Sequence, residues 1–319
     1  MGINLTIKEI IIAIVIIVIV GIGSFYAGAS TTPAKTITST VTSTTVSTTT
    51  ITITPPGAIV KDTTPRVGIV VAMPIEAKYV FEHLHKEKSF EAFGYNFTVG
   101  TIAGKPVVIV LCGIGEEAAA GAVFAMNTLF NIKWAVNIGT SGSHSYKHDT
   151  GDVIVAARIV PYGNRKYVSY SEWRYMKLGV MFPNGTRLRF LYLNCSKELI
   201  DLASKAAKKI TLPPTPAELI GANVTYYPKI YLNGTIASAD IWTANSTYIL
   251  RLHKELGTDA EEMEAYGFGL ACYRLGIPFL KIAVISNNEL TGSPWCLKSI
   301  EVSMRNGVAL LVEMIKLGG

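Results

Sequence analysis

The sequence lacks the patterns that identify several classes of protein. Its 319 residues include only four cysteines, Cys112, Cys195, Cys272 and Cys296, with no CxxC and no Cys/His ligand spacing. This absence argues against a structural zinc site, and we predict no metal site. Cys112 and Cys272 lie in apolar segments and are expected in the core. Cys195 and Cys296 lie in more polar surroundings and could pair in an oxidising compartment.

Charge is also sparse. Asp, Glu, Lys and Arg make up 16% of the residues, and the formal net charge of +6 comes from scattered Lys and Arg with no dense basic run. A solvated surface explains this charge better than a nucleic-acid-binding face, so we predict no nucleic-acid partner.

The N-terminal region has no charged residue from Ile10 to Ala29. Twenty apolar helical residues span the roughly 30 Å hydrocarbon core of a bilayer. We predict a short segment at 1–8 and a transmembrane anchor at 9–29, with the domain outside the cell. A cleaved signal peptide is the alternative, because small residues follow the apolar run, and the protein would then be secreted.

Residues 30–63 are dominated by Ser and Thr and carry almost no charge. No face of this segment can bury a core, so we predict an extended stalk, with strand pairing as the alternative. Glycosylation outside the cell is favoured by six Asn-X-Ser/Thr triplets, which begin at Asn96, Asn184, Asn194, Asn223, Asn233 and Asn245.

Residues 64–319 alternate between strand and helix patterns. Short apolar, β-branched runs predict strands at 67–73, 106–115, 134–142, 151–160, 230–240 and 279–287. Helical patterns occupy 116–130, 197–210 (with Ser196 as N-cap), 247–256, 265–276 and 302–317. The alternation predicts a single α/β domain with a central mixed β-sheet flanked by helices.

Polar or small residues follow four of these strands, where α/β sheets place their ligands. The clusters are MPIE (73–76), GTSG (139–142), SADIW (238–242) and ISNN (285–288), and a fifth, EEMEAYG (261–267), precedes a helix. Taken singly, each has a structural explanation, such as an ordinary turn or the acidic first turn of a helix.

Their order and spacing are more specific. Together with CGIGEEAAA and GDVIVA they resemble the nucleoside phosphorylase/nucleosidase family (the purine and uridine phosphorylase superfamily), and within it most of all the methylthioadenosine/S-adenosylhomocysteine nucleosidases. The resemblance implies a purine nucleoside as ligand, no cofactor, and a homo-oligomer, a dimer or larger.

The resemblance also implies roles for individual residues. Thr140, Ser141 and Gly142 match the loop that borders the sugar and base, and Trp242 matches an aromatic residue that stacks on the purine.

In the family's V-E-M-E motif, Met packs on the ribose and the second Glu accepts hydrogen bonds from its hydroxyls. Glu262, Met263 and Glu264 match this motif. A carboxylate there would stabilise the oxocarbenium-like sugar formed as the glycosidic bond breaks. The alternative for Glu264 is a surface carboxylate.

Two positions distinguish hydrolysis from phosphorolysis. Glu76 matches the glutamate that orients water in the nucleosidases, where phosphorylases have an arginine. The second phosphate arginine aligns with Asn137. Phosphate favours cationic, bidentate partners, so we predict a purine nucleosidase. A phosphorylase remains an alternative if Arg165, Arg174 or a neighbouring subunit supplies the cation.

One position departs from the nucleosidase pattern. Ser286 matches the family's I-S, but Asn287 follows where an Asp protonates N7 of the leaving base. An amide can donate a hydrogen bond but cannot act as a general acid. The change could indicate 6-oxopurine substrates, a slower enzyme or a non-catalytic nucleoside-binding protein. An alignment shifted by one residue would place Asn288 there instead.

Overall fold

A computed structural model of the chain describes residues 61–169 and 172–319. The predicted anchor at 9–29 and nearly all of the predicted stalk at 30–63 lie outside these residues. Within the part described, no helix is both long enough and apolar enough to cross a membrane.

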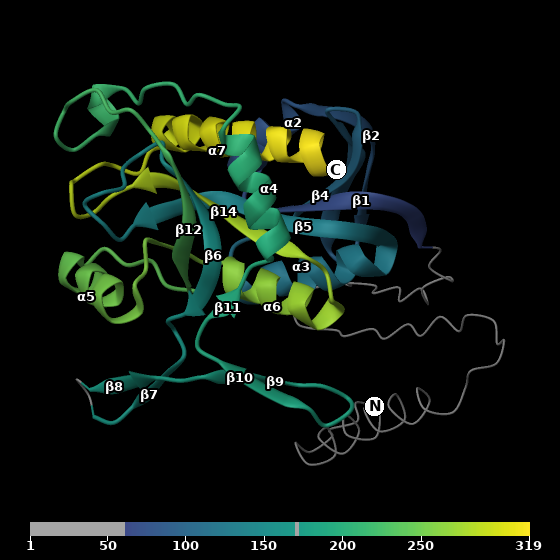
Figure 1. Cartoon of the computed structure of the whole chain (residues 1–319), viewed down its shortest axis with the longest axis horizontal. Helices are drawn as coiled ribbons and strands as arrows, with labels where there is room; N and C mark the ends of the chain where they lie inside the picture. The colour runs from purple at the N-terminus through teal and green to yellow at the C-terminus, as the bar shows by residue number, and fades with distance from the viewer. Residues whose placement is uncertain (1–60, 170–171) are drawn as a thin grey trace, which may run out of the picture. The chain divides into compact units, whose positions relative to one another are not determined.

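A mixed sheet of ten strands forms the centre of the fold, as predicted (Figure 1). Its order is β11-β6-β12-β13-β5-β1-β4-β3-β2, and β14 pairs with both β5 and β6. The parallel pairs are β1 with β4 and β5, β14 with β5, and β12 with β6 and β13. The strands are β1 (Asp62–Val71), β2 (Leu84–Ala92), β3 (Tyr95–Ile102), β4 (Lys105–Leu111), β5 (Phe130–Ser143), β6 (Val153–Pro161), β11 (Leu193–Asn194), β12 (Ile230–Ser238), β13 (Ala260–Glu262) and β14 (Phe279–Asn287).

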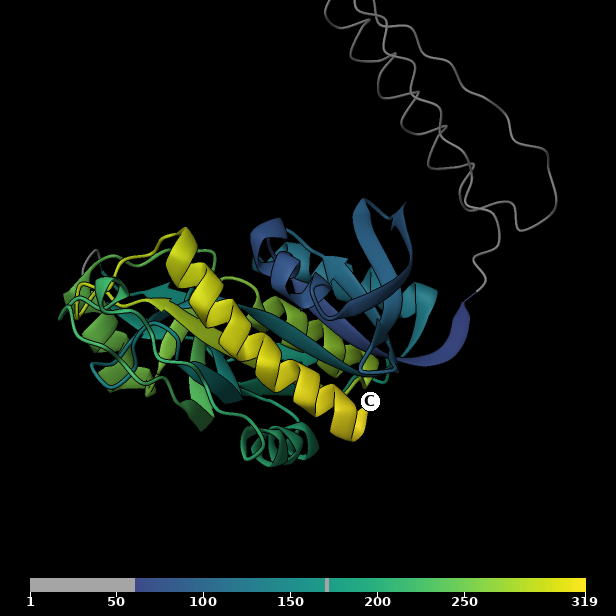
Figure 2. The same cartoon turned by 90° about the horizontal axis from the view of Figure 1, so that it is seen from above.

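Helices cover both faces of this sheet. They are α2 (Pro74–Phe81), α3 (Glu116–Leu129), α4 (Lys197–Ala207), α5 (Ser246–Leu256), α6 (Ala265–Leu275) and α7 (Leu297–Gly318), with a 3₁₀ turn at Ala217–Leu219. In Figure 1, α7 lies above β5 and β14, while α3 and α6 lie below them. Figure 2 shows α7 running across its face of the domain. All nine residues of β14 are buried, which explains its mostly apolar sequence.

One helix start and one helix cap differ from the prediction. α7 begins at Leu297, five residues before the expected start, because Cys296 and Ser299 form a capping box ahead of the apolar pattern. Ser196 is the N-cap residue of α4 as predicted, but its side chain does not cap the helix. Its hydroxyl instead accepts a hydrogen bond from the Phe279 backbone N–H at 2.9 Å, which joins α4 to the start of β14.

Two short ribbons occupy the region between β6 and β11, where the sequence has no regular pattern. β7 (Arg165–Tyr167) pairs with β8 (Trp173–Tyr175), and β9 (Leu178–Met181) pairs with β10 (Arg187–Phe190). Figure 1 shows the two ribbons end to end below the domain. Strands of two to four residues are too short for periodicity to predict.

The suggested pairing of Cys195 with Cys296 is wrong in this structure, since all four cysteines are free. Cys195 is buried in the core with Cys112 and Cys272, and only Cys296 is half-buried. The polar neighbours of Cys195 in the sequence belong to the exposed side of the β11–α4 connection, whereas its own side chain points inward.

Candidate active site

The carboxyl ends of the parallel strands surround a cavity of about 210 Å³. Ligands bind at this edge of open α/β sheets. The structure brings together all ten residues that the sequence analysis selected, and each lines the cavity: Glu76, Thr140, Ser141, Gly142, Trp242, Glu262, Met263, Glu264, Ser286 and Asn287. The lining is completed by Ala72, Met73, Ile114, Ile241, Glu261 and Trp295.

Glu76 lies in the first turn of α2, which begins just after β1 ends. It is 2% exposed. One carboxylate oxygen accepts hydrogen bonds from the backbone N–H and the hydroxyl of Thr140, both at 2.7 Å, and the other accepts from the Met73 N–H at 3.1 Å. Burial nevertheless raises the pKa of Glu76. A carboxylate with a raised pKa takes a proton from bound water more readily than an exposed one does.

Glu264 is the N-cap residue of α6 and is 7% exposed. Its Oε1 accepts a hydrogen bond from the Gly115 N–H at 3.1 Å. Gly115 has φ = 114°, which side-chain-bearing residues rarely adopt, and it ends the turn between β4 and α3. Burial, followed by the neighbouring Glu262 carboxylate, raises the pKa of Glu264 to about 7.

Glu262 is held by a buried cation. Its Oε2 lies 3.0 Å from the Lys281 Nζ, and Lys281 also donates to the Asn137 Oδ1 at 2.8 Å. The Glu262 carboxylate accepts from the backbone N–H groups of Glu264 and Ala265 as well, so it orients the first turn of α6. Lys281 is fully buried and does not line the cavity.

Asn287 ends β14 at one side of the cavity and is 5% exposed. Its Nδ2 donates to the Glu289 Oε1, and its Oδ1 accepts from the Ser286 hydroxyl, both at 3.4 Å. Asn288 is fully buried and does not line the cavity. The alternative alignment, with Asn288 in the site, is therefore wrong.

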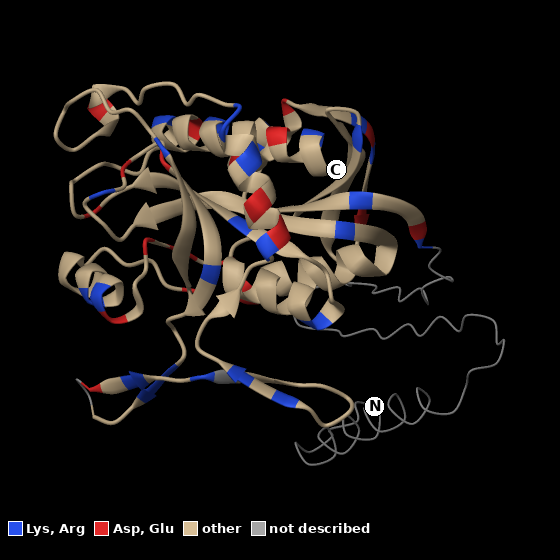
Figure 3. Ribbon diagram, in the orientation of Figure 1, with Lys and Arg blue, Asp and Glu red and all other residues tan. Residues whose placement is uncertain are grey.

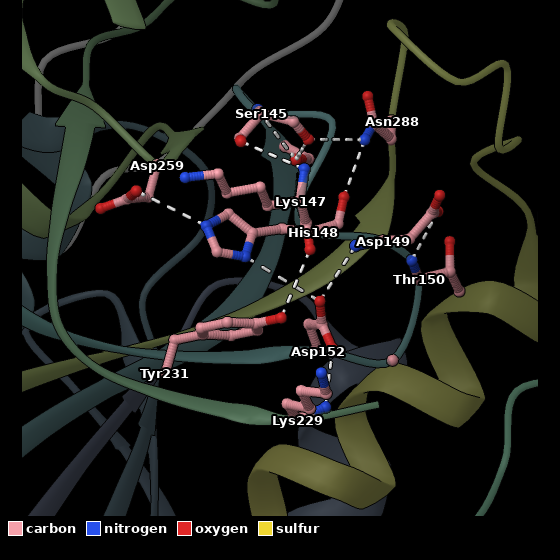
Figure 4. A network of polar contacts seen from close by, with 12 residues as sticks. Ser145, Lys147, His148, Asp149, Thr150, Asp152, Lys229, Tyr231, Asp259 and Asn288 are labelled. Atoms are coloured by element: carbon pink, nitrogen blue, oxygen red, sulfur yellow. Dashed lines mark hydrogen bonds and ion pairs between the residues drawn. The ribbon is translucent and has the colours of Figure 1, made fainter. Parts of the chain in front are cut away.

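Asn288 instead fastens the end of β14 to the segment between β5 and β6. Its Nδ2 donates to the backbone carbonyls of Ser145 at 3.0 Å and His148 at 2.7 Å (Figure 4). The His148 Nε2 lies 3.5 Å from the Asp259 Oδ1, and Tyr231 packs edge-on against the His148 ring. This network fixes the backbone immediately beyond Asn287.

Two tryptophans stand at the mouth of the cavity. Trp242 follows β12, Trp295 precedes α7, and their rings meet in a T-shaped contact with centroids 5.5 Å apart. Trp242 is 59% exposed and Trp295 is 44% exposed. In such a pair, the edge of one ring packs on the face of the other, which stabilises both. The exposed parts of the rings remain available to contact a planar ligand.

Sequence reasoning missed several contributors. Trp295 is a lone aromatic residue in a polar loop, so no local pattern indicates its place. Glu261 belongs to EEMEAYG, but the sequence assigns it no role. Its carboxylate accepts from the Tyr162 hydroxyl at 3.0 Å and the Thr243 N–H at 2.9 Å, and it lies 3.3 Å from the His144 Nε2.

The charge of the cavity has one sign. Four of its sixteen lining residues are glutamates, and none is Lys, Arg or His. Asn137 is buried beneath the site and bonded to Lys281 and the Val70 carbonyl. Arg165 and Arg174, the suggested sources of phosphate-binding cations, lie on the β7–β8 ribbon and do not line the cavity.

Comparison with known proteins shows the family of the chain. The family model described as the phosphorylase superfamily matches residues 66–316. The 5'-methylthioadenosine/S-adenosylhomocysteine nucleosidase of Psychromonas ingrahamii is 26% identical over 257 residues, covering 78% of this chain and 98% of the relative. The corresponding enzyme of Colwellia psychrerythraea is 25% identical over 252 residues, covering 78% and 95%. Residues 66–316 thus correspond to nearly the whole length of these relatives.

Solved structures share the fold. Futalosine hydrolase of Helicobacter pylori superposes with a TM-score of 0.61 at 20% identity, covering 79% of this chain and 98% of that one. The Colwellia psychrerythraea nucleosidase in complex with adenine gives a TM-score of 0.62 at 23% identity, covering 80% and 96%.

Proposed function

Since the chain belongs to the phosphorylase superfamily, in the neighbourhood of the methylthioadenosine/S-adenosylhomocysteine nucleosidases, we propose that it is a purine nucleosidase. It hydrolyses the N-glycosidic bond of a purine nucleoside, or of a 5'-substituted one, to base and sugar. The observation that carries the proposal is the cavity lined by four glutamates and no cation. Such a lining stabilises a cationic sugar and repels phosphate, so water is the nucleophile.

The proposed mechanism assigns each carboxylate a task. The Glu264 carboxylate, fixed by the Gly115 N–H, accepts hydrogen bonds from the ribose hydroxyls and stabilises the positive charge that develops on the sugar. Met263 packs on the ribose. Glu76, fixed by Thr140 and Met73, orients the water and takes its proton as the carbon–oxygen bond forms.

The leaving base is bound by Trp242, Ser141, Gly142 and Asn287. Asn287 donates a hydrogen bond to N7 but has no proton to transfer. The base therefore departs with the glycosidic electron pair and takes its proton from solvent. This favours bases that tolerate negative charge, such as 6-oxopurines, over adenine.

The test uses residues 61–319 incubated with adenosine, inosine, guanosine and methylthioadenosine, with and without phosphate, and free base measured by chromatography. We expect release that is independent of phosphate. Glu76→Gln and Glu264→Gln should each lower kcat by about 100-fold or more, because each removes a charge needed in the transition state. The exposed Glu91→Gln serves as the control. Release only in the presence of phosphate, or full activity in both folded variants, would reject the mechanism.

Asn287 also favours a second candidate, a nucleoside-binding protein without catalysis. The distinguishing variant is Asn287→Asp, which restores an acid at the same position. If the wild-type chain binds nucleosides in calorimetry without releasing base, and Asn287→Asp releases it, the binding protein is correct. If both release base, the nucleosidase is correct, and we expect the variant to act faster on adenosine than the wild type.

The cellular setting belongs to the same proposal. Residues 9–29 anchor the chain, residues 30–63 form a stalk, and the domain lies outside the cell as a glycosylated homo-oligomer; cleavage of the N-terminal segment would instead secrete it. All six sequon asparagines are exposed, which supports access for glycosylation. Protease digestion of intact cells, glycosidase treatment and light scattering test location, glycans and assembly in turn.

A further inference from the structure

The net charge of the chain is concentrated in one small region. Residues 165–190 contain six Lys and Arg residues and a single acid, Glu172, a net charge of +5 out of +6 for the whole chain. These residues form the β7–β8 and β9–β10 ribbons, and Figure 3 shows Lys and Arg distributed along both. The net charge that the sequence analysis interpreted as scattered is therefore concentrated in one segment, which the structure folds into two ribbons.

The strand register places these cations on exposed surfaces. Lys166 pairs with Arg174 across β7 and β8, and both are exposed. Arg187 and Arg189 are two positions apart on β10, so they share one side of their ribbon, and both are exposed. Lys177, between the ribbons, is exposed too.

The opposite sides of the ribbons pack on the domain. The Arg251 guanidinium of α5 lies 4.0 Å above the Trp173 ring of β8. On β10, the ring of Phe190 meets that of Tyr273, on α6, with centroids 6.0 Å apart. Two-stranded ribbons are marginally stable alone, so these contacts hold them and set which side faces outward.

The exposed cations have no counter-charge in the described part of the chain. None of the five forms an ion pair there. Other exposed lysines, such as Lys86 and Lys254, also lack one, but they lie on separate elements, whereas these five lie together on and between two adjoining ribbons. Gathering like charges without partners opposes folding, and an anionic partner removes that cost.

Apolar side chains are exposed among the same cations. Beside the cations these are Val168 at 53%, Met176 at 42% and Met181 at 57% exposure. The phosphates of a nucleic acid would neutralise the cations, but a nucleic acid has little apolar surface to contact Val168 and the two methionines. The boundary between lipid headgroups and acyl chains accepts both kinds of side chain.

We propose that the two ribbons dock the domain on an anionic membrane surface. Lys166, Arg174, Lys177, Arg187 and Arg189 contact lipid phosphates, while the exposed apolar side chains enter the headgroup boundary. The proposal concerns residues 61–319 alone and does not depend on an N-terminal anchor or on the reaction at the cavity.

The test measures co-sedimentation of residues 61–319 with vesicles, which is appropriate because the relatives correspond to this region over nearly their full length. We expect binding to vesicles that contain phosphatidylglycerol, weaker binding in high salt, and little binding to pure phosphatidylcholine. Each cation near the surface contributes about fivefold in affinity. Replacing all five by Ser should reduce binding to the phosphatidylcholine level.

A matched control removes the same charge elsewhere, through Ser at the exposed Lys86, Lys88, Lys133, Lys205 and Lys254. This variant should bind vesicles within a few fold of the wild type. Circular dichroism melts establish that both variants are folded. Equal loss in the two variants, no binding by the wild type, or preferential binding of an oligonucleotide over vesicles would each overturn the proposal. So would a shift of the ribbon variant from dimer to monomer with vesicle binding unchanged.

Discussion

Glu76 and Glu264 are buried carboxylates whose hydrogen bonds come mainly from backbone N–H groups. Their positions are set by where β5 ends and where the β4–α3 turn places Gly115. Burial raises the pKa of both, and that of Glu264 reaches about 7. Burying these ionised carboxylates lowers the folding stability of the domain. In return, the site holds negative charge where a cationic sugar would form.

The raised pKa of Glu264 makes the stability of the domain depend on pH. The pKa of Glu264 rises from 4.5 in the unfolded chain to about 7 in the folded one, so between these values the folded state binds more protons. The free energy of unfolding therefore falls as pH rises through this window and stays lower above it. At 1.36 kcal/mol per pH unit, the penalty at pH 8 is about 3 kcal/mol.

The Gln variant should thus be more stable than the wild type at pH 8 and nearly equal to it at pH 4. Denaturant unfolding at both pH values measures this. The exposed Glu117→Gln should show little difference at either pH. A Glu264→Gln variant less stable than the wild type at pH 8 would contradict the assignment.

Sequence alone selected residues that the structure gathers in one cavity. This was possible because the motifs lie at strand ends and occur along the chain in the same order as in the family. The sequence could not indicate Lys281, whose Nζ is buried behind Glu262 within a mostly apolar strand. It selected Asn287 over Asn288 from the alignment with the family motif and had no structural ground for the choice. Adjacent strand residues point to opposite sides, and only the register reveals which side holds the cavity.

At the scale of elements, the turn from β4 into α3 meets the start of α6. Gly267, in the first turn of α6, lies so close to α3 that an added Cβ would be 1.9 Å from the Glu116 carbonyl oxygen. Gly115 and Glu264, the two residues joined by the hydrogen bond, flank this contact. The approach of the two helices therefore sets the geometry of the site.

Gly267→Ala should accordingly destabilise the domain by about 3 kcal/mol, despite the better helix propensity of Ala. Gly276→Ala, at the end of the same helix, is the matched comparison. Its φ of 69° costs about 1–2 kcal/mol, but nothing lies within 4 Å of the new Cβ. Thermal unfolding should rank Gly267→Ala well below Gly276→Ala, and the reverse order would show that the helices separate easily.

Long elements could be predicted from the sequence, and short ones could not. β14 runs from 279 to 287 as expected, because it is buried along its whole length. β13 has three residues, and β11 has two. Their strand conformation comes from pairing with β5, β12 and β6 rather than from their own residues.

At the scale of the whole molecule, the start of the domain differs from the predicted boundary at 64. β1 begins at Asp62, whose Oδ2 accepts from the Arg66 Nε at 3.0 Å, and Arg66 is 8% exposed. Cutting at residue 64 removes the closer partner of a nearly buried guanidinium and leaves only Glu87, whose Oε2 lies 4.0 Å from the Arg66 Nη2.

Residues 61–319 should therefore unfold at a higher temperature than residues 64–319. The difference expected for losing one charged hydrogen bond is about 2 kcal/mol, or roughly 4–8 °C for a domain of this size. Asp62→Ala within residues 61–319 should behave like the shorter fragment. Identical melting of the two fragments would mean that Glu87 alone is a sufficient partner for Arg66.

The pair of tryptophans at the cavity mouth has a practical consequence. The chain has only four tryptophans, and two of them, Trp242 and Trp295, touch each other beside the proposed base. A purine that enters between them alters their fluorescence emission. The intrinsic tryptophan fluorescence therefore measures how much of the site is occupied, without an added label. Stopped-flow fluorescence would then time the arrival of a nucleoside and the departure of its base as separate events.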